Sequence, residues 1–269
     1  MSNWIQVSLE AGITTLTLNR PEIRNALSDQ SSIAELVRVL EEADAESNSR
    51  VIILTGAGAA FCAGGDLRAL APESGGPVSN RSTQTRTNYR VGIQRIPLAF
   101  DRLEKPVIAA INGPAVGAGF DLACMCDIRV ASESAVFSSS FVTLGLVPGD
   151  GGAWFLPGIV GWSKAAELIL TGRHISAREA LNMGLVSSLV ADGESLAAAN
   201  TLASEIVANP YDAVRMSKAL LREARRGTLA SVLELSATFQ AHAHQTEEHR
   251  NLLADALKAR KRAQSPSAN

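Results

Sequence analysis

Apolar and polar residues alternate in two short segments near the start of the chain, 4–9 and 13–18, which flank an Ala-Gly pair. Alternation with a period of two is typical of half-buried strands, and a short turn that contains glycine joins such strands into a hairpin. Apolar residues then recur at helical spacing over 33–40, after Ser28 as a candidate helix cap. The pattern therefore predicts strand, strand, helix as the first unit of the fold.

Two later segments, 51–55 and 107–111, are apolar without interruption. Such runs are typical of parallel strands that are buried on both faces. Between them, the turn-rich segment 71–81 predicts a mobile surface loop, and 83–103 predicts one helix. We expect further strands at 128–131, 135–138 and 186–190, with short helices between them.

From residue 196 onward the pattern is helical almost to the end of the chain. The sequence thus divides into a core over 1–195, a helical C-terminal subdomain over 196–262 and a disordered polar tail over 263–269. The C-terminal helices carry apolar stripes that a small subdomain could not bury alone, so we expect packing against another subunit. These apolar residues are Leu229, Val232, Leu233, Leu235 and Phe239.

Charge and composition limit the partners and the cellular location that fit the sequence. In 269 residues, 25 Lys and Arg nearly balance 27 Asp and Glu, which gives no sign of a nucleic-acid partner. The first ten residues lack the pattern of a signal peptide, and no apolar run reaches the length of a membrane span. Three cysteines, an odd number, fit reduced thiols. We expect a cytoplasmic protein that contacts no membrane.

Two glycine-rich segments, 60–67 and 111–122, each follow an apolar strand. Small residues let a ligand approach the main chain closely, so that backbone N–H groups can bind it directly. If a helix begins near Gly117, the N–H of Ala118 is one of its unpaired first-turn donors and lies at the positive end of the helix dipole. The second segment therefore offers a place where negative charge can develop.

A series of motifs along the chain resembles the successive signatures of the crotonase superfamily, the enoyl-CoA hydratases and isomerases. These motifs are Leu18-Asn19-Arg20-Pro21, Arg24-Asn25-Ala26-Leu27, Ala63-Gly64-Gly65-Asp66, Asn112-Gly113, Gly117-Ala118-Gly119, Cys126-Asp127, Gly145-Leu146-Val147-Pro148-Gly149, Thr171-Gly172 and Gly184-Leu185-Val186. The resemblance covers nearly the whole chain. It implies an α/β fold, a ClpP-like spiral of ββα units with a helical C-terminal trimerisation region. It also implies a homotrimer or dimer of trimers that binds acyl-CoA thioesters.

The resemblance also implies roles for individual residues. In that family the thioester carbonyl lies between two peptide N–H donors, which here correspond to Ala63 and Ala118. Removal of one such donor typically costs about 2.7 to 4 kcal/mol of transition-state stabilisation. The phosphates of coenzyme A are expected near Arg24, and its adenine along the main chain of 63–67. The expected substrate-binding residues are Arg24, Ala26, Gly64, Gly65, Asp66, Leu67, Gly117 and Phe141.

Proton transfer beside a thioester carbonyl requires a positioned carboxyl group. Asp121 lies three residues after Ala118, on the same face of the expected helix, among apolar neighbours that would raise its pKa. Hydratases of the family commonly carry glutamate at this position, whereas aspartate followed by leucine resembles the dienoyl-CoA isomerases. The alternative is a buried aspartate that only accepts hydrogen bonds from the backbone.

The second acid of the hydratases falls on Phe141, which cannot transfer a proton. Asp150, in a glycine-rich segment after Pro148, is a candidate replacement, although it could equally be a helix N-cap. We therefore expect an enoyl-CoA hydratase/isomerase-type enzyme that favours isomerisation, with proton transfer by Asp121, by Asp150 or by both.

Other classes of protein fit the sequence less well. The glycine pattern after residue 55 lacks the third glycine of a dinucleotide-binding turn, and the chain contains no P-loop and no nucleophile elbow. We expect no metal site, because Cys124 and Cys126 lie in an apolar stretch and the C-terminal histidines suit a solvated helix face. We also expect no cofactor other than the coenzyme A of the substrate. The alternatives that stay open are a non-catalytic acyl-CoA-binding protein and an NAD-dependent oxidoreductase.

Overall fold

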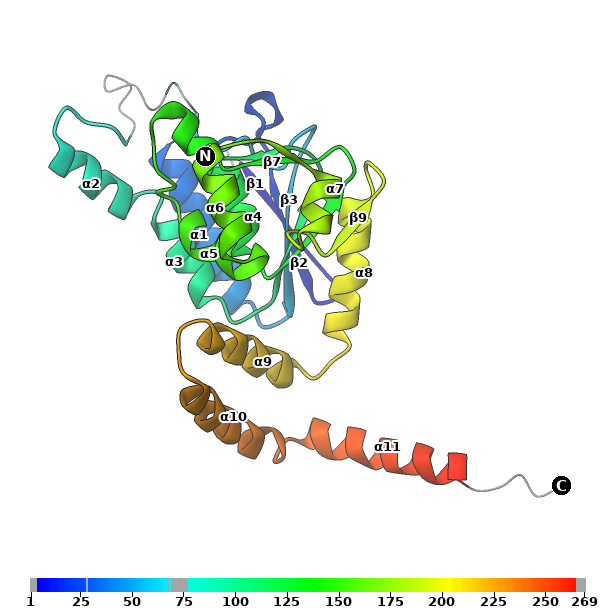
Figure 1. Ribbon diagram of the computed structural model, residues 1–269. Coiled ribbons are helices and arrows are strands. Elements are labelled where there is room, and N and C mark those ends of the chain that lie inside the picture. The colour runs from blue at the N-terminus through cyan, green and yellow to red at the C-terminus, as the bar shows by residue number, and fades with distance from the viewer. Residues whose placement is uncertain (1–3, 28, 67, 69–76, 265–269) are drawn as a thin grey trace. The chain divides into compact units, whose positions relative to one another are not determined.

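The computed structural model describes residues 4–27, 29–66, 68 and 77–264. The first two strands form the predicted antiparallel hairpin, and parallel pairs extend it to a six-stranded sheet of order β1-β2-β3-β4-β6-β9 (Figure 1). The strands are β1 (Ile5–Glu10), β2 (Ile13–Leu18), β3 (Val51–Gly56), β4 (Val107–Ile111), β6 (Ile128–Ser132) and β9 (Ser188–Val190). The helices of the same part of the chain are α1 (Gln30–Ala45), α2 (Ser82–Val91), α3 (Arg95–Arg102), α4 (Ala118–Met125), α5 (Gly152–Val160), α6 (Trp162–Thr171), α7 (Ala177–Asn182) and α8 (Ser195–Val207).

Helices cover both faces of this sheet, which explains why its central strands are apolar throughout. Ile52 and Leu54 of β3 face a large core that includes residues of α1, α3 and α4. Val51 and Ile53 face a smaller core with α8. Because successive side chains of a strand point to opposite faces, two helical layers require a continuous apolar run. Figure 1 shows α8 on one side of the sheet and α1, α3 and α5 on the other.

Helix α1 buries the predicted apolar stripe, but its N-cap is Asp29 rather than Ser28, which lies outside the described residues. The Asp29 carboxylate accepts the N–H of Ser32 at 2.7 Å, and Ser32 Oγ accepts the N–H of Asp29 at 3.3 Å. This reciprocal pair is a capping box and fixes where the helix begins.

The expectation of one helix over 83–103 is wrong, because the chain forms α2 and α3 with a break at Gly92. Gly92 has φ −106° and ψ −116°, far from helical values. Pro97 lies in the first turn of α3, where its missing N–H is tolerated. The expected mobile loop over 71–81 falls mostly on 69–76, which lies outside the described residues.

A second, three-stranded sheet joins β5 (Ala115–Val116), β7 (Val136–Ser138) and β8 (Ile175–Ser176) in the order β5-β7-β8. The sequence predicts β7 but not β5 and β8, which are only two residues long and have no periodicity. The short 3-10 turn η3 (Ser140–Leu144) follows β7. Because the N–H of Gly117 donates to the carbonyl of Ser138 at 2.8 Å, the start of α4 lies beside the entry to η3.

The chain divides into two compact units, Met1–Val207 and Ala208–Asn269. The expected boundary after residue 195 therefore differs from the observed one by the length of α8. This helix belongs to the first unit because Ala199 and Ala203 are fully buried in the smaller core against the sheet. The second unit contains α9 (Tyr211–Ala224), α10 (Leu229–Ala243) and α11 (Glu247–Gln264). Of the predicted tail, 265–269 lie outside the described residues.

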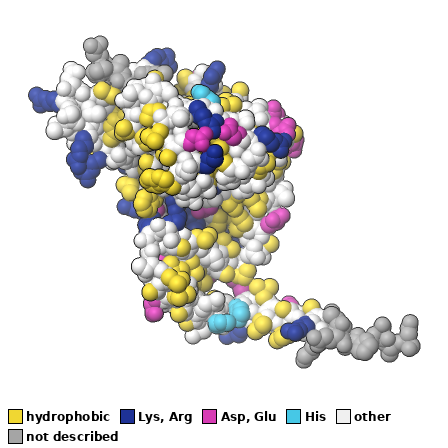
Figure 2. Space-filling view, viewed as in Figure 1, with side chains coloured by type: hydrophobic (Ala, Val, Ile, Leu, Met, Phe, Trp, Pro, Cys, Tyr) yellow, Lys and Arg dark blue, Asp and Glu magenta, His cyan; other side chains and the backbone are white. Residues whose placement is uncertain are grey.

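Exposed apolar side chains occur in both units. In the second unit neither α9 nor α10 has a buried residue, and Leu229 and Leu233 of the predicted stripe are exposed. In the first unit Trp154 of α5 and Trp162 of α6 are exposed, and Figure 2 shows hydrophobic side chains gathered over these two helices. No helix within the described part of the chain combines the length and hydropathy that a membrane crossing requires.

Candidate active site

The start of α4 meets the glycine-rich segment that follows β3. Gly117 is the N-cap of α4, with φ 54°, and Ala118 is its first residue. A methyl group added at Gly64 would lie 3.2 Å from the nitrogen of Ala118 and would overlap the carbonyl of Val116. Only glycine therefore permits this close approach of two main-chain segments. The N–H of Ala118, as a first-turn donor, has no partner within the helix.

The predicted pair of main-chain donors requires one correction. The N–H of Ala63 donates to the carbonyl of Arg24 at 2.9 Å, so it is already used within the fold. Gly65 lies next to Gly64 and is solvent-exposed, and its N–H makes no hydrogen bond to any residue that the structure describes. The N–H of Ala118 has no partner among the described residues, so its predicted role as a donor stays a prediction, and Gly65 rather than Ala63 offers the second unpaired N–H.

Asn25 organises the loop that holds these donors, a role that the sequence motif alone does not reveal. Its side-chain nitrogen donates to the carbonyls of Ala57 at 3.0 Å and Ala60 at 2.8 Å, and its side-chain oxygen accepts the N–H of Arg20 at 2.9 Å. Asn25 is fully buried. It therefore fastens the segment after β2 to the segment after β3.

Asp121 lies in the first turn of α4 and is fully buried. Its Oδ2 accepts the N–H of Gly152 at 3.0 Å, while Oδ1 has no hydrogen-bond partner among the described residues. Burial, and then the negative charge of Asp150, raise the pKa of Asp121 to about 8, although the Gly152 hydrogen bond acts in the opposite direction. One backbone donor thus satisfies one of its oxygens, and the other has no hydrogen-bond partner within the described structure.

Asp150 is also buried, and burial raises its pKa to about 6. The N-cap of α5 is Gly151, and no side chain accepts a hydrogen bond at this helix start, so the alternative reading of Asp150 as a cap is wrong. A methyl group added at Gly152 would overlap the Asp121 carboxylate. The glycine pair after Asp150 therefore lets its loop approach α4.

Phe141 lies in η3 beside the same helix start. A methyl group added at Gly117 would lie 3.9 Å from Phe141 Cζ and 3.9 Å from Ser140 Oγ. Phe141 is partly buried. An aromatic ring thus lies beside the start of α4, at the position where the family resemblance implies the second acid of a hydratase.

The remaining predicted substrate-binding residues lie on the loops around these donors. Arg24 is exposed and has φ 52°, and Ala26 is buried. Asp66 accepts hydrogen bonds from the Arg68 guanidinium, at 3.0 Å for the shortest, and these hold the pKa of Asp66 below its usual range. Leu67 lies outside the described residues.

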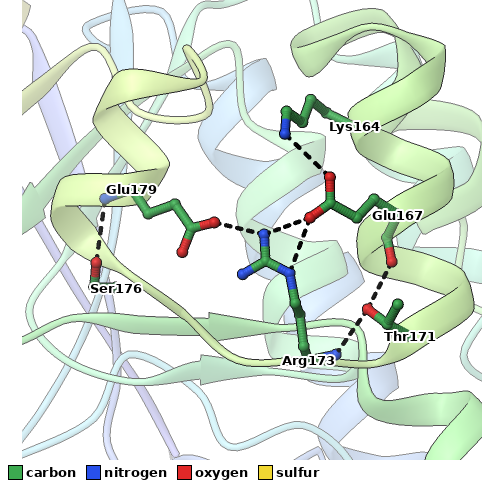
Figure 3. Close-up of polar contacts among 6 residues, drawn as sticks. All are labelled: Lys164, Glu167, Thr171, Arg173, Ser176 and Glu179. Carbon is green, nitrogen blue, oxygen red and sulfur yellow. Dashed lines mark hydrogen bonds and ion pairs between the residues drawn. The ribbon is translucent and has the colours of Figure 1, made fainter.

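A second cluster of carboxylates surrounds Arg173, at the corner between α6 and α7 (Figure 3). The guanidinium contacts Glu167 at 2.7 Å and Glu179 at 2.5 Å, and Lys164 contacts Glu167 at 3.0 Å. Hydrogen bonds from Arg173 hold the pKa of both glutamates below the usual range. These paired, half-exposed carboxylates do not resemble a catalytic pair.

Among the described residues, the cysteines and the possible metal ligands form no second cluster. Cys62, Cys124 and Cys126 are free and buried, and burial raises the pKa of Cys62 to about 12, which disfavours a thiolate. Within the described ranges, no group of three or more His, Cys, Asp or Glu side chains is arranged to hold a metal ion.

The fold and the site together define a crotonase-fold protein, in which main-chain donors at a helix start lie beside a buried carboxyl group. The model of the enoyl-CoA hydratase/isomerase family matches residues 8–262, and the chain belongs to this family.

Individual relatives agree with this assignment. The 1,2-epoxyphenylacetyl-CoA isomerase of Escherichia coli is 36% identical over 251 residues, which cover 93% of this chain and 94% of the relative. The short-chain-enoyl-CoA hydratase of Clostridium acetobutylicum is 33% identical and covers 96% of each chain. The crystal structure of an enoyl-CoA hydratase from Bacillus anthracis matches with a TM-score of 0.85 at 34% identity and covers 98% of each chain. The predicted superfamily and α/β fold class are thus confirmed.

Proposed function

We propose that the chain isomerises the double bond of an enoyl-CoA thioester through an enolate intermediate. One observation carries this proposal, the pair of buried aspartates whose pKa values are raised to different extents. With a pKa of about 8, Asp121 keeps its proton at neutral pH, whereas Asp150, with a pKa of about 6, is mostly ionised. One acid and one base in the same site can move a proton between two carbon atoms.

The proposed reaction starts from a 3-enoyl-CoA thioester. The Asp150 carboxylate takes a proton from C2, and the electron pair moves onto the thioester oxygen, which accepts hydrogen bonds from the N–H groups of Gly65 and Ala118. The Asp121 carboxyl group then protonates C4 as the electrons return, so the double bond moves from C3–C4 to C2–C3. Transfer of one proton from Asp150 to Asp121 restores the starting state.

The absence of a carboxyl group at position 141, where the family resemblance places the second acid of the hydratases, favours isomerisation over hydration. Phe141 lies beside Gly117 and has no proton to exchange and no group that would orient a water molecule. The names of the relatives include both an isomerase and a hydratase, so they support the use of a CoA thioester without deciding between the two reactions. In this proposal Phe141 shapes the space for the acyl chain.

A panel assay tests the proposal directly. Purified protein is given 2-enoyl-, 3-enoyl- and dienoyl-CoA thioesters, and the products are separated by chromatography. We expect interconversion of 3-enoyl and 2-enoyl esters, with slower formation of 3-hydroxyacyl-CoA. Phe141→Glu should raise hydration of the 2-enoyl ester relative to isomerisation, because it supplies the missing carboxyl group. Hydration as the main wild-type reaction would contradict the isomerase assignment.

The same panel separates the proposal from its alternatives. Turnover of any enoyl-CoA eliminates a non-catalytic acyl-CoA-binding protein, whereas tight binding without turnover would favour it. A nicotinamide titration under the same conditions tests for an NAD-dependent oxidoreductase. We further propose that Arg24, which is exposed on the loop after β2, binds phosphates of coenzyme A. Arg24→Ala should then raise KM with little change in kcat.

We also propose that the chain assembles as a homotrimer or a dimer of trimers. Leu229 and Leu233 of α10 are exposed, and α10 has no buried residue. These observations support assembly, because contact with another subunit would bury this apolar surface. Light scattering of the purified protein measures the assembly, and a monomer at micromolar concentration would contradict it.

A further inference from the structure

Asp150 lies in a short loop, 149–152, whose own residues do little to restrict its conformation. Three of its four residues are glycines, Gly149, Gly151 and Gly152, and Gly151 has φ 106°. Glycine has wide conformational freedom, so such a loop would let a carboxylate move. Contacts from outside the loop must therefore decide where the Asp150 side chain lies.

One side of the loop is held by α4, through the hydrogen bond from Gly152 to Asp121. The other side is held by α2 and the turn that follows it. Gln94 Nε2 donates to the carbonyl of Gly149 at 3.1 Å. A methyl group added at Gly149 would lie 3.1 Å from Tyr89 Cε1 and 3.4 Å from Cδ1, so the ring packs against this glycine.

The two holding residues are coupled to each other. The N–H of Gln94 donates to the carbonyl of Tyr89 at 3.1 Å, across the turn that contains Gly92. Burial and the charge of Asp150 raise the pKa of Tyr89, which also shows that the phenol lies within the electrostatic reach of Asp150. The charge of Asp150 thus raises the pKa of two groups on the elements packed around its loop, Tyr89 from α2 and Asp121 from α4.

We propose that Gln94 and Tyr89 are positioning residues, which hold the Gly149 peptide so that Asp150 faces the substrate beside Asp121. This inference rests on the proposed function in so far as it assigns proton transfer to Asp150. Neither residue exchanges a proton in the reaction. They act through the loop, and a displacement of about 1 Å in such a group can lower a rate about a hundredfold.

Gln94→Leu tests the proposal, since it removes the donor and keeps the approximate size. We expect kcat to fall about tenfold to a hundredfold, with KM changed less than about twofold. The limb of the pH–rate profile that follows Asp150 should move to lower pH, because a looser loop admits water and favours the ionised carboxylate. Gln84→Leu is the matched control, because Gln84 lies on α2 and its side chain donates to Asn88 at 2.9 Å. It should leave kcat and the profile unchanged.

Two variants of Tyr89 separate packing from the hydroxyl group. Tyr89→Ala removes the ring from a helix that has no buried residue, so the protein should still fold, and it should lower kcat as Gln94→Leu does. Tyr89→Phe keeps the packing against Gly149 and should retain most of the wild-type kcat. Equal losses from both variants would overturn the packing role.

An NMR titration of the aspartate carboxyl carbons provides a readout without substrate, with Asp150→Asn to assign the signal. A lower Asp150 pKa in Gln94→Leu supports the proposal even if no enoyl-CoA in the panel is turned over. A lowered Asp150 pKa without turnover of any enoyl-CoA would contradict the proposed function but support the positioning role of Gln94. A folded Gln94→Leu protein with the wild-type Asp150 titration and the wild-type kcat would overturn the inference.

Discussion

Two groups of carboxylates lie in the first unit and differ in almost every physical respect. Asp121 and Asp150 are buried, no cation pairs with them among the described residues, and their pKa values are raised. Glu167 and Glu179 lie partly exposed on either side of Arg173, and their pKa values are lowered (Figure 3). Burial thus raises the pKa of the carboxyl groups at one place, and hydrogen bonds from a guanidinium lower it at the other.

This difference in pKa supports the proposed assignment of proton transfer to Asp121 and Asp150. An ionised carboxylate fixed by a guanidinium has little tendency to exchange a proton near neutral pH, so it serves to hold α6 against α7. A buried carboxyl group whose pKa lies near the working pH can both give and take a proton. The main-chain N–H groups of the two regions also differ in whether they are hydrogen-bonded. At the Arg173 corner the N–H of Gly172 is bonded to Leu168 at 3.0 Å, whereas Gly65 and Ala118 leave theirs unpaired within the described structure.

The largest effect should come from neutralising the buried pair. Asp121→Asn and Asp150→Asn should each lower kcat about a hundredfold to ten-thousandfold, the usual contribution of a general acid or base. Glu167→Gln and Glu179→Gln are matched controls and should stay within about twofold. Single-turnover kinetics with a 3-enoyl-CoA ester measures all four. Near wild-type turnover in Asp121→Asn, together with loss in Asp150→Asn, would leave Asp150 as the sole proton carrier.

The next effect concerns the unpaired main-chain donors. Ala118→Pro deletes the N–H at the first position of α4, where proline is tolerated, and should lower kcat at least about a hundredfold in a folded protein. Ala118→Gly keeps the N–H and should retain most of the activity. Circular dichroism checks the fold of both variants. An active, folded Ala118→Pro protein would mean that the thioester oxygen binds elsewhere.

The pattern of residues in the sequence predicts the β1–β4 strands because each has a clear period or an unbroken apolar run. It also leads to α4 and Asp121, since the glycine signature and the helix phase are local features. It assigns the second main-chain donor to Ala63, whose N–H is already bonded to Arg24, whereas the N–H of Gly65, two residues later, is unpaired within the described structure. Which N–H is free depends on pairing with Arg24, some forty residues away, and no local pattern reports that pairing.

The pKa values of the buried carboxyl groups are another property that the sequence alone does not predict. Asp150 could be read equally as a helix cap or as an acid, and only the position of Gly151 as the N-cap of α5 decides against the cap. The raised pKa of Asp150 comes from burial, which depends on the tertiary structure and not on its sequence neighbours alone. The same limit applies to Gln94 and Tyr89, whose contacts with Gly149 require the break at Gly92 that helical periodicity over 83–103 does not predict.

The free energy of unfolding should depend on pH in opposite directions for the buried aspartates and for the glutamates beside Arg173. The folded-state pKa of Asp121 lies above its unfolded value, so folding is favoured at low pH and stability falls as pH rises from about 4 to about 8. Asp121→Asn should therefore gain roughly 3 kcal/mol relative to wild type between pH 5 and pH 8. Urea unfolding at several pH values measures this gain.

Glu167 serves as the comparison in that experiment. The pKa of Glu167 is lowered in the folded state, so its contribution to stability is present above the ordinary glutamate value of 4.5 and is lost as pH falls. Glu167→Gln should differ from wild type by a small and constant amount between pH 5 and pH 8. A parallel pH dependence in both variants would contradict the assignment of Asp121 as a buried, protonated group.

The smallest effect should come from Arg173→Ala. The guanidinium loses two partners, but both glutamates are partly exposed and Glu167 keeps Lys164 at 3.0 Å, so solvent and the lysine compensate for most of the loss. Tm should fall by about 2 °C or less, with kcat unchanged. Arg173→Lys keeps the charge without the two-nitrogen contact and should lie between wild type and Arg173→Ala.

Arg173→Ala also tests whether the Arg173 cluster and the buried aspartates are independent of each other. Gly172, next to Arg173, accepts a hydrogen bond from Ser138 Oγ at 3.0 Å, and the carbonyl of Ser138 accepts the N–H of Gly117 at the start of α4. Two hydrogen bonds, one from the side chain of Ser138 and one to its carbonyl, therefore connect the corner to the start of α4. If Arg173→Ala lowers kcat tenfold while Tm changes little, the Arg173 cluster does more than hold two helices together. An unchanged kcat, measured together with the fall for Asp121→Asn, would establish that the two groups of carboxylates act independently.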